Sequence, residues 1–502
     1  MKKIKKILIA NRGEIAVRII RACRELNIPT VAVYSDPDAL SLAVALADEA
    51  VELGPAPPLE SYLNMERLIA AAKATGCDAV HPGYGFLAEN AQFARLCREN
   101  ALIFIGPSPE VIGKVGDKLI ARRMMEAAEI PIIPGLELAS KKEADLSAAA
   151  RQIGFPLMVK ASAGGGGKGM RIVRKAEELS AAVAAGSREA RKAFGDETVY
   201  LEKFIENPRH IEFQVLADQQ ENIIHLFERE CSIQRRHQKI IEETPSPFLN
   251  EDLRRQMGET ACRVMEAVGY DNAGTVEFLM DADQNYYFLE VNARIQVEHP
   301  VTELVTGVDL VKEQIRIAGG EPLKLSQEQV FQRGHAIECR IYAEDPENSF
   351  FPSIGHLLYV EEPVGPGIRC DSGIRTGMEI THHYDPILSK LIAFADSREQ
   401  AVQKMLAALQ DYVILGIKTS LPFLRAVIDH PQFQTGDIDT HFIARNFSDW
   451  REEFPESDRQ TALVAAALLG EMPEKPRAVS GAASRIPSPW QSLGKWQGIS
   501  SD

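Results

Sequence analysis

VEFLMDADQNYYFLEVNARIQVEHP, residues 276–300, contains two strand-like runs joined by a polar turn around Asp283 and Gln284. In a hairpin that is symmetric about this turn, Glu277 lies opposite Glu290, because both are equally distant from it. Two carboxylates directly opposed destabilise a strand pair unless a cation lies between them. Asn292 offers a further oxygen ligand on the same face. The hairpin therefore predicts a site for a hard divalent cation, with an ordinary amphipathic surface strand as the alternative.

The polar face of this hairpin is expected to continue beyond Asn292. Arg294, Gln296 and Glu298 keep the same parity, while the residues between them are apolar. This face carries both signs of charge interleaved with amides. That pattern is typical of a site that holds an anion next to a metal ion.

A glycine-rich run, KASAGGGGKGM at residues 160–170, follows a strand-like segment. Glycine lets backbone N–H groups approach phosphate oxygens closely, and Lys160 and Lys168 add positive charge. The run is not a Walker A loop, because Gly169 rather than Ser or Thr follows Lys168. It predicts a mobile flap over phosphate groups, with a flexible hairpin tip as the alternative.

A third cluster, SIQRRHQK at residues 232–239, concentrates hydrogen-bond donors in an acidic chain. Such a charged run is most often a solvated face. Here apolar strand-like segments bracket it, which favours a binding site. His210 alone is more typical of a structural histidine, and only its neighbours give it weight as a ligand.

The regions around these motifs predict an α/β and α+β multidomain protein. Short apolar runs alternate with helical patterns in residues 1–115, which indicates a parallel sheet wrapped by helices. A second region spans residues 116–334, and a third of mixed α+β character spans 335–446. Residues 447–502 contain all three tryptophans, a short Ala/Leu helix and a proline-containing stretch, and they are expected to form a tail or linker.

Composition excludes several classes of protein. With 502 residues, 45% hydrophobic and 25% charged, the chain has ordinary soluble composition. The net charge of −15 argues against nucleic acid and anionic membranes as partners. No apolar run approaches the ~20 residues that span a bilayer. The seven cysteines lie far apart in the sequence, without the spacing of a zinc site or a disulfide framework, so a cytoplasmic location is expected.

The chain resembles the biotin carboxylases of the ATP-grasp superfamily from about residue 7 to residue 445. The strings that carry this resemblance are ANRGEIAVRIIRACREL, HPGYGFLAEN, KASAGGGGKGM, ENPRHIEFQVLAD, SIQRRHQK, EVNARIQVEHPVTE and GHAIECRIYAEDP. It implies a Rossmann-like N-terminal domain, an ATP-grasp domain with a mobile lid at about residues 131–204, and a mixed C-terminal domain.

The resemblance also implies a role for each matching residue. The implied ATP-binding residues are Lys118, Lys160, Gly165, Gly166, Gly167, Glu202, Lys203, Phe204, Ile205, His210, Gln234, His237, Glu277, Leu279 and Glu290. The implied ligands of two Mg²⁺ or Mn²⁺ ions are Glu277, Glu290 and Asn292. The implied bicarbonate pocket consists of Lys239, Arg294, Gln296, Val297 and Glu298. Tyr84 and Arg340 match positions at the biotin ureido ring. The implied catalytic residues are Glu298, Arg340, Arg294 and Lys239.

The implied reaction is the carboxylation of biotin with ATP and bicarbonate through carboxyphosphate. Glu298 would act as general base and Arg340 would stabilise the enolate-like ureido oxygen. No Met-Lys-Met biotin-attachment motif occurs, so biotin is expected on a separate carrier protein, with carboxyltransferase subunits as further partners. The expected holoenzyme is an acetyl-CoA carboxylase of fatty acid biosynthesis, or a relative acting on another acyl-CoA or on pyruvate. Arg18, Arg21 and Glu25 match positions at a homodimer contact.

Three alternatives compete with this interpretation. Another ATP-grasp ligase could activate a different carboxylate as an acyl phosphate. A dinucleotide-dependent oxidoreductase would rest on Gly83, Gly85 and Ala88, which fit a loose G-x-G-x-x-A pattern after a strand-like run. A non-catalytic scaffold would tolerate Glu298→Gln.

Overall fold

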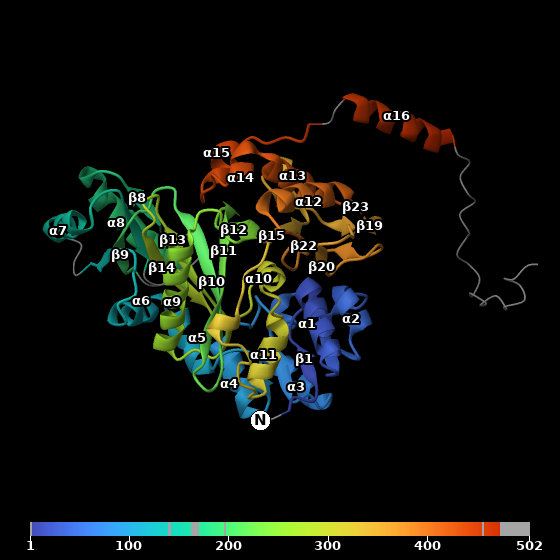
Figure 1. Cartoon of the computed structure of the whole chain (residues 1–502), viewed down its shortest axis with the longest axis horizontal. Coiled ribbons are helices and arrows are strands. Elements are labelled where there is room, and N and C mark those ends of the chain that lie inside the picture. The colour runs from blue at the N-terminus through green and yellow to red at the C-terminus, as the bar shows by residue number, and fades with distance from the viewer. Residues whose placement is uncertain (1–2, 139–141, 162–169, 195–196, 454–455, 472–502) are drawn as a thin grey trace, which may run out of the picture. The chain divides into compact units, whose positions relative to one another are not determined.

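The computed structural model describes residues 3–138, 142–161, 170–194, 197–453 and 456–471. It divides into two compact units, Met1–Arg451 and Glu452–Asp502. All the sheets described below belong to the first unit (Figure 1). The second unit contains α16 (Glu456–Glu471), in agreement with the helix expected there. Among the described helices, none combines the length and the apolar character needed to cross a membrane.

The first region forms the expected parallel sheet. Its strands in spatial order are β3 (Glu49–Gly54), β2 (Thr30–Ser35), β1 (Ile7–Ile9), β4 (Ala79–His81) and β5 (Ile103–Phe104). The intervening helices are α1 (Gly13–Glu25), α2 (Leu42–Leu46), α3 (Met65–Ala74) and α4 (Ala91–Glu99). The three residues of β1 are fully buried at the centre of the sheet, which explains their uninterrupted apolar character.

The segment after β4 does not have the geometry of a dinucleotide-binding turn. Gly83 and Gly85 have φ of +62° and +66°, and α4 begins only at Ala91. A dinucleotide fold would open a helix directly on these glycines, so that its N-terminus could face a pyrophosphate. Instead, the Asn11 side chain donates hydrogen bonds to the carbonyls of Pro82 and Tyr84 at 2.7 Å and fixes the segment against β1.

The region predicted to form a lid contains a separate antiparallel sheet. Its strands in order are β6 (Gly135–Glu137), β9 (Val199–Lys203), β7 (Leu157–Ala161) and β8 (Arg171–Val173). Helices α7 (Glu143–Ile153) and α8 (Leu179–Phe194) pack against it around a core of their own. Gly165, Gly166, Gly167 and Lys168 lie outside the described residues.

An antiparallel sheet of eight strands forms the centre of the first unit. Its strands in order are β14 (Tyr286–Asn292), β13 (Asn272–Met280), β10 (Arg209–Ala217), β11 (Ile223–Arg235), β12 (Gln238–Thr244), β15 (His335–Tyr342), β22 (Ile387–Ala395) and β20 (Ile368–Ser372). Pairing of β12 with β15 makes this sheet continuous across residue 334, the predicted end of the second region. Proposed site residues of the second and third regions therefore share one sheet.

Helices flank this central sheet. α9 (Glu251–Val268) packs on β10 and β11; the Asn250 side chain caps its N-terminus at 2.9 Å, and Gly269, at φ +68°, follows its last residue. The remaining helices are α5 (Pro109–Gly116), α6 (Lys118–Ala127), α10 (His299–Thr306), α11 (Leu310–Ala318), α12 (Arg398–Asp411), α13 (Leu421–Asp429), α14 (Pro431–Thr435) and α15 (Phe442–Asn446). Short strand pairs complete the unit: β16 (Glu344–Asp345) with β17 (Phe351–Pro352), β18 (Gly355–His356) with β21 (Glu379–Ile380), and β19 (Tyr359–Glu361) with β23 (Val413–Leu415).

Residues just after position 446, assigned to the tail from the sequence, pack on the first unit. The Trp450 ring lies edge-on to Phe423 with 5.3 Å between ring centroids. Phe447 also contacts Phe423, at 5.5 Å. These aromatic contacts extend the apolar core of the third region up to Trp450. Trp490 and Trp496 lie outside the described residues.

Candidate functional site

Glu277 and Glu290 lie opposite each other in the hairpin of residues 276–300, as expected, although the strands are not symmetric about the turn. Phe278 pairs with Phe288, and a bulge between Glu277 and Phe278 shifts the register by one residue. Glu277 on β13 pairs directly with Glu290 on β14, and the turn between the strands lies at Asp281–Asn285. The strand was expected to continue to Glu298, but β14 ends at Asn292, and this expectation was wrong. The Ala293 N–H donates to Glu89 Oε1 at 2.9 Å, so a carboxylate from the first region draws the chain away from the sheet.

A cavity of about 590 Å³ collects almost every residue predicted for the site. Those that line it are Lys118, Lys160, Glu202, Lys203, Phe204, Ile205, His210, Gln234, His237, Lys239, Glu277, Leu279, Glu290, Asn292, Arg294, Gln296, Val297, Glu298 and Arg340. They come from the lid sheet, the central sheet, α6 and the loop after β14. Segments more than two hundred residues apart in the sequence thus meet around one cavity.

Lys239 lies among three buried carboxylates. Its Nζ is 2.7 Å from Glu277 Oε1 and 2.8 Å from Glu298 Oε1, and it also contacts Glu212. Burial alone would raise the pKa of Glu277, but Lys239 and His210 outweigh burial and hold this pKa well below its ordinary value. Glu277 is therefore ionised and already paired.

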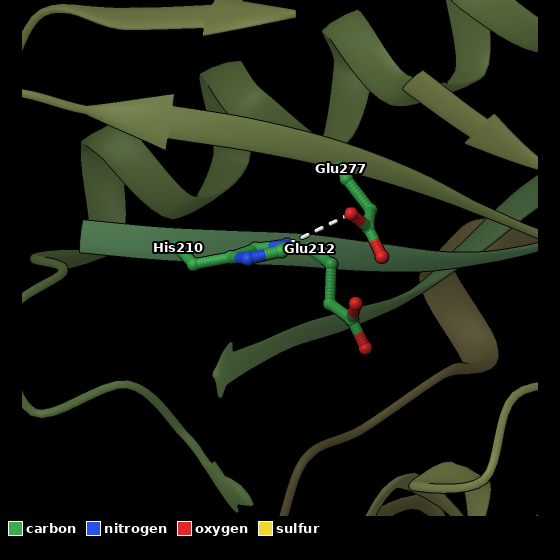
Figure 2. Close-up of side chains that lie close together, drawn as sticks. All are labelled: His210, Glu212 and Glu277. Atoms are coloured by element: carbon green, nitrogen blue, oxygen red, sulfur yellow. Dashed lines mark ion pairs between the residues drawn. The ribbon is translucent and has the colours of Figure 1, made fainter. Parts of the chain in front are cut away.

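The group His210, Glu212 and Glu277 has the composition of a metal site. Figure 2 shows His210 and Glu212 projecting from β10 and Glu277 from the neighbouring strand, with His210 Nε2 2.9 Å from Glu277 Oε2. A cation at this point would compete with the ammonium of Lys239, which already contacts both carboxylates. The side of Glu277 that faces Glu290 suits a metal ion better.

The negative charge of Glu290 has fewer close positive partners than that of Glu277. The nearest described cationic group to Glu290 is Lys118 Nζ, at 3.8 Å from Oε2. Burial and the charge of Glu277 both raise the pKa of Glu290. Asn292 lies two residues further along β14, and its Oδ1, the atom that could bind a metal ion, accepts a hydrogen bond from Arg294 Nη2 at 2.9 Å. Two carboxylates with an amide beside them form a donor set that fits a hard cation such as Mg²⁺.

Glu298 lies between two cations at the floor of the cavity. Besides Lys239, the Arg340 guanidinium contacts it, with Nη2 2.9 Å from Glu298 Oε2. Arg340 Nε also donates to Glu242 at 2.6 Å. Burial would raise the pKa of Glu298, but Lys239 and Arg340 lower it far below its ordinary value. Glu298 is therefore ionised.

A second cavity of about 390 Å³ shares Arg294, Val297 and Arg340 with the first. Tyr84 and Glu14 line this second cavity. Of the described residues predicted for the site, Tyr84 alone lies outside the first cavity, and it lines the second cavity together with Arg340.

Arg229 is a buried residue of the site that the sequence interpretation missed. It is 0% exposed and donates to Glu212 Oε1 at 2.5 Å and to Gln296 Oε1 at 2.8 Å. Gln296 Nε2 in turn donates to Glu277 Oε1 at 2.9 Å. Arg229 thus holds the side chains of Glu212 and Gln296 in place. The sequence feature that could have indicated Arg229 is a charged residue within the strand-like segment ERECS.

Several cavity-lining residues were also missed. They are Ile133, Met158, Met170, Pro208, Gln238, Leu289, Thr440 and His441. Most are apolar and form the walls, for which a single sequence gives no distinctive signal. Thr440 reaches the cavity because its N–H donates to the Pro208 carbonyl at 3.0 Å, a contact across 232 residues.

Three family models match consecutive parts of the chain. They are "Biotin carboxylase, N-terminal domain" at residues 3–112, "Carbamoyl-phosphate synthase L chain, ATP binding domain" at 117–326 and "Biotin carboxylase C-terminal domain" at 338–445.

The proteins similar to this chain include biotin carboxylases and subunits of other carboxylases. A biotin carboxylase of Halalkalibacterium halodurans is 53% identical over 442 residues, which cover 88% of this chain and 98% of the relative. A pyruvate carboxylase subunit from Methanothermobacter thermautotrophicus is 50% identical over 438 residues, covering 87% of this chain and 89% of the relative. The human mitochondrial propionyl-CoA carboxylase alpha chain is 51% identical over 450 residues, covering 89% of this chain and 62% of the relative.

Solved structures match at comparable levels. The Campylobacter jejuni biotin carboxylase complex with β-γ-ATP is 43% identical with a TM-score of 0.84, covering 88% of this chain and 99% of that chain. The biotin carboxylase domain dimer of Hydrogenobacter thermophilus 2-oxoglutarate carboxylase, in complex with MgADP, ADP and bicarbonate, is 47% identical with a TM-score of 0.84. It covers 90% of this chain and 100% of that chain.

Proposed function

Because the chain belongs to the biotin carboxylase family and is an ATP-dependent ligase, we propose that the cavity around Glu298 carboxylates biotin with bicarbonate. The observation that carries the proposal is the convergence of Lys239 and Arg340 on Glu298, next to the opposed pair Glu277 and Glu290. This arrangement combines an anion site, a general base and a cation site in one cavity.

ATP is assigned to the end of the cavity formed by the lid sheet and β10. Lys118 and Lys160 supply positive charge for phosphates, and Glu202 to Ile205 form the edge next to the adenine. Leu279, Met158 and Met170 give this end an apolar wall. His210, Gln234 and His237 complete the nucleotide site, together with Gly165, Gly166 and Gly167 of the proposed flap. The flap and lid would exclude water from the reacting phosphate.

Glu277, Glu290 and Asn292 would hold the magnesium or manganese ions, for which we propose two positions. Repulsion between the two carboxylates and the raised pKa of Glu290 support this assignment, because a cation relieves both. Bound metal supplies a positive charge that orients the ATP phosphates and offsets the charge on the leaving ADP.

Bicarbonate is assigned to the space bounded by Lys239, Arg294, Gln296, Val297 and Glu298. Arg294 is anchored to Glu89, with Nε 3.0 Å from Oε2, so its guanidinium is held in place for an anion. Ionised Glu298 takes the bicarbonate proton and makes the anion a stronger nucleophile.

The reaction then proceeds in two steps. A bicarbonate oxygen attacks the γ-phosphorus while the bond to the bridging oxygen breaks, giving carboxyphosphate and ADP. Carboxyphosphate then breaks into carbon dioxide and phosphate, which begins the second step. The phosphate takes the N1 proton of biotin, and N1 forms the new bond to the carbon of carbon dioxide. Arg340 stabilises the enolate-like ureido oxygen, and Tyr84 borders the biotin ring.

Biotin is proposed to arrive on a separate carrier protein, and a carboxyltransferase would pass the carboxyl group to its final acceptor. Relatives named for pyruvate, propionyl-CoA and methylcrotonoyl-CoA are about equally similar to this chain. We keep acetyl-CoA, another acyl-CoA and pyruvate as candidate acceptors, and propose domains at residues 1–115, 116–334 and 335–446.

A homodimer is also proposed. Of the three α1 residues matched to a dimer contact, Arg21 and Glu25 are exposed. Arg18 is buried and pairs within the chain with Glu303 at 2.9 Å and Asp309 at 2.7 Å. Glu25 also contacts Lys312 within the chain, so Arg21 supports the dimer proposal most directly of the three.

The test is ADP release by the purified protein with Mg²⁺ and ATP. We expect release to depend on bicarbonate and to increase on addition of free biotin. Dependence on a different carboxylate, without an effect of biotin, would favour another ATP-grasp ligase and contradict the proposal.

A further inference from the structure

Lys390 is a buried lysine on β22 for which the proposed reaction has no role. Its exposed fraction is 0%, and its Nζ donates to the Val297 carbonyl at 2.8 Å. The same Nζ lies 3.3 Å from Glu14 Oε2. A buried ammonium is costly unless it is paired, so these contacts restrict where the side chain can lie.

Glu14 connects this lysine to the biotin side of the site. It is 2% exposed in the first turn of α1, and its other oxygen, Oε1, accepts a hydrogen bond from the Tyr84 hydroxyl. Lys390 Nζ lies 5.9 Å from the centre of the Tyr84 ring. Lys390, Glu14 and Tyr84 thus form a chain of contacts from the central sheet to the second cavity.

Through its contact with Val297, Lys390 also reaches the part of the site proposed for bicarbonate. Val297 lines both cavities and belongs to the loop between β14 and α10. His299 Nδ1 lies 2.8 Å from the Gln296 carbonyl oxygen of the same loop. Lys390 therefore fixes the Val297 carbonyl, and His299 contacts the preceding carbonyl, that of Gln296.

The position of Lys390 in the sheet is unusual in its charge. It pairs directly with Arg340 on β15 and with Asp371 on β20. Two cations opposed on neighbouring strands repel each other. Glu298 and Glu242 compensate Arg340, while Glu14 and Asp371 lie near Lys390. Lys390 and Arg340 thus repel each other at buried positions next to the proposed reacting groups.

Glu338 does not replace Glu14 as the partner of Lys390. It is 0% exposed, and neither carboxylate oxygen has a hydrogen-bond partner among the described residues. Burial raises the pKa of Glu338 well above its ordinary value, although Lys390 opposes this. Burial also raises the pKa of Glu14, to about 7, although Lys390 opposes this, whereas Arg369 and Lys390 hold the pKa of Asp371 well below its ordinary value. Asp371 is therefore the firmer counter-charge, and Glu14 is the partner that reaches Tyr84.

We propose that Lys390 is a positioning residue that couples the bicarbonate half of the site to the biotin half, by holding the Val297 carbonyl and the Glu14–Tyr84 pair in one arrangement. The inference rests on the proposed function. Carbon dioxide formed beside Val297 must reach a biotin ring bordered by Tyr84 and Arg340 before it escapes. Without Lys390, less biotin would be carboxylated for each ATP consumed.

The test compares Lys390→Met, which keeps the aliphatic stem and removes the charge, with the wild-type protein. Three quantities are measured: carboxybiotin formed per ADP, the KM for free biotin, and the Kd for ATP. We expect the KM for biotin to rise about tenfold and the carboxybiotin yield per ADP to fall about fivefold. The Kd for ATP should stay within about twofold, because Lys390 does not line the nucleotide cavity.

Two further variants make the test specific. Lys390→Arg keeps the charge and should recover part of the carboxybiotin yield, which loss of packing alone would not explain. If Lys390→Met does not fold, Lys390→Met/Glu14→Gln removes both charges together and takes its place. Lys324→Met, at an exposed lysine paired with Glu321 at 3.3 Å, is the control and should behave as wild type.

Two results would overturn the inference. One is a Lys390→Met protein whose yield per ADP and biotin KM equal those of wild type. The other is a parallel loss of ATP affinity and of every rate by the same factor, with no recovery in Lys390→Arg. If wild-type protein itself forms no carboxybiotin, the proposed function fails instead, so the two failures can be distinguished.

Discussion

Lys239 Nζ lies 2.8 Å from Glu298 Oε1, while the same ammonium lies 2.7 Å from Glu277 Oε1 on the metal side of the cavity. One buried cation thus contacts both the proposed general base and a proposed metal ligand. Arg340 contacts Glu298 from the other side. The carboxylate is therefore held in its ionised form at the point where bicarbonate would lose its proton.

Replacing Glu298 with Gln removes the proton acceptor but keeps the size of the side chain. We expect bicarbonate-dependent ADP release to fall about 100-fold, with an unchanged circular dichroism spectrum. The measurement is a steady-state assay across bicarbonate concentrations. Glu328→Gln, at an exposed acid, is the matched control. Full activity in Glu298→Gln would remove this residue from the proposed mechanism.

Glu290→Gln and Glu277→Gln should differ in their effects. Glu290 is opposed by Glu277 and only distantly paired, so its neutralisation should leave the Tm in EDTA unchanged or slightly higher. Glu277→Gln breaks contacts with Lys239 and His210 and should lower the Tm. Both should weaken binding of Mg–ATP by about tenfold or more. Calorimetric titration with and without Mg²⁺ measures this, and equal affinities in all three proteins would rule out the assigned metal ligands.

Arg229→Met should be costly, although Arg229 does not line the cavity. The change leaves the buried Glu212 carboxylate with one cation fewer and frees Gln296. We expect a loss of about 3 kcal/mol in stability and a higher KM for bicarbonate. Thermal unfolding and bicarbonate titration test these effects. A stable variant with unchanged bicarbonate KM would show that Arg229 does not orient Gln296.

Glu243 should make the protein sensitive to acid. Burial would raise the pKa of this carboxylate, but contacts with His335 and Arg398 lower it to about 2. A lowered folded-state pKa stabilises the protein above the ordinary value of 4.5, and the effect is lost as the pH falls from there toward 2. The stabilisation is roughly 3 kcal/mol.

Thermal unfolding of wild type and Glu243→Gln across this pH range tests the expectation. The Tm difference should be largest near neutral pH and should shrink as the pH falls below about 4.5. A difference that stays constant down to pH 3 would contradict the assigned pKa.

Local patterns predicted much of this site, because its chemistry lies in short motifs. The pairing of Glu277 with Glu290 was expected from a symmetric turn, but it depends on a bulge between Glu277 and Phe278, because Phe278 pairs with Phe288, one residue out of that register. The end of β14 at Asn292 could not be predicted in this way, because it depends on Glu89, some two hundred residues away in the sequence. Thr440 likewise reaches the cavity through a contact with Pro208 that leaves no local signal.

Buried charge was harder to interpret from the sequence than exposed charge. Arg229 and Lys390 stand in buried strands, and their partners come from other strands, from the loop after β14 and from α1. The family resemblance supplied the residues that would touch substrates. The residues that hold them in place became visible only when the strands were paired.

The central claim is that bicarbonate attacks ATP before biotin is carboxylated. The most direct measurement uses bicarbonate labelled with ¹⁸O in all positions, together with ATP, Mg²⁺ and biotin. Attack of a bicarbonate oxygen on the γ-phosphorus transfers one ¹⁸O atom to each inorganic phosphate released. Phosphate without label, formed while carboxybiotin accumulates, would contradict the account.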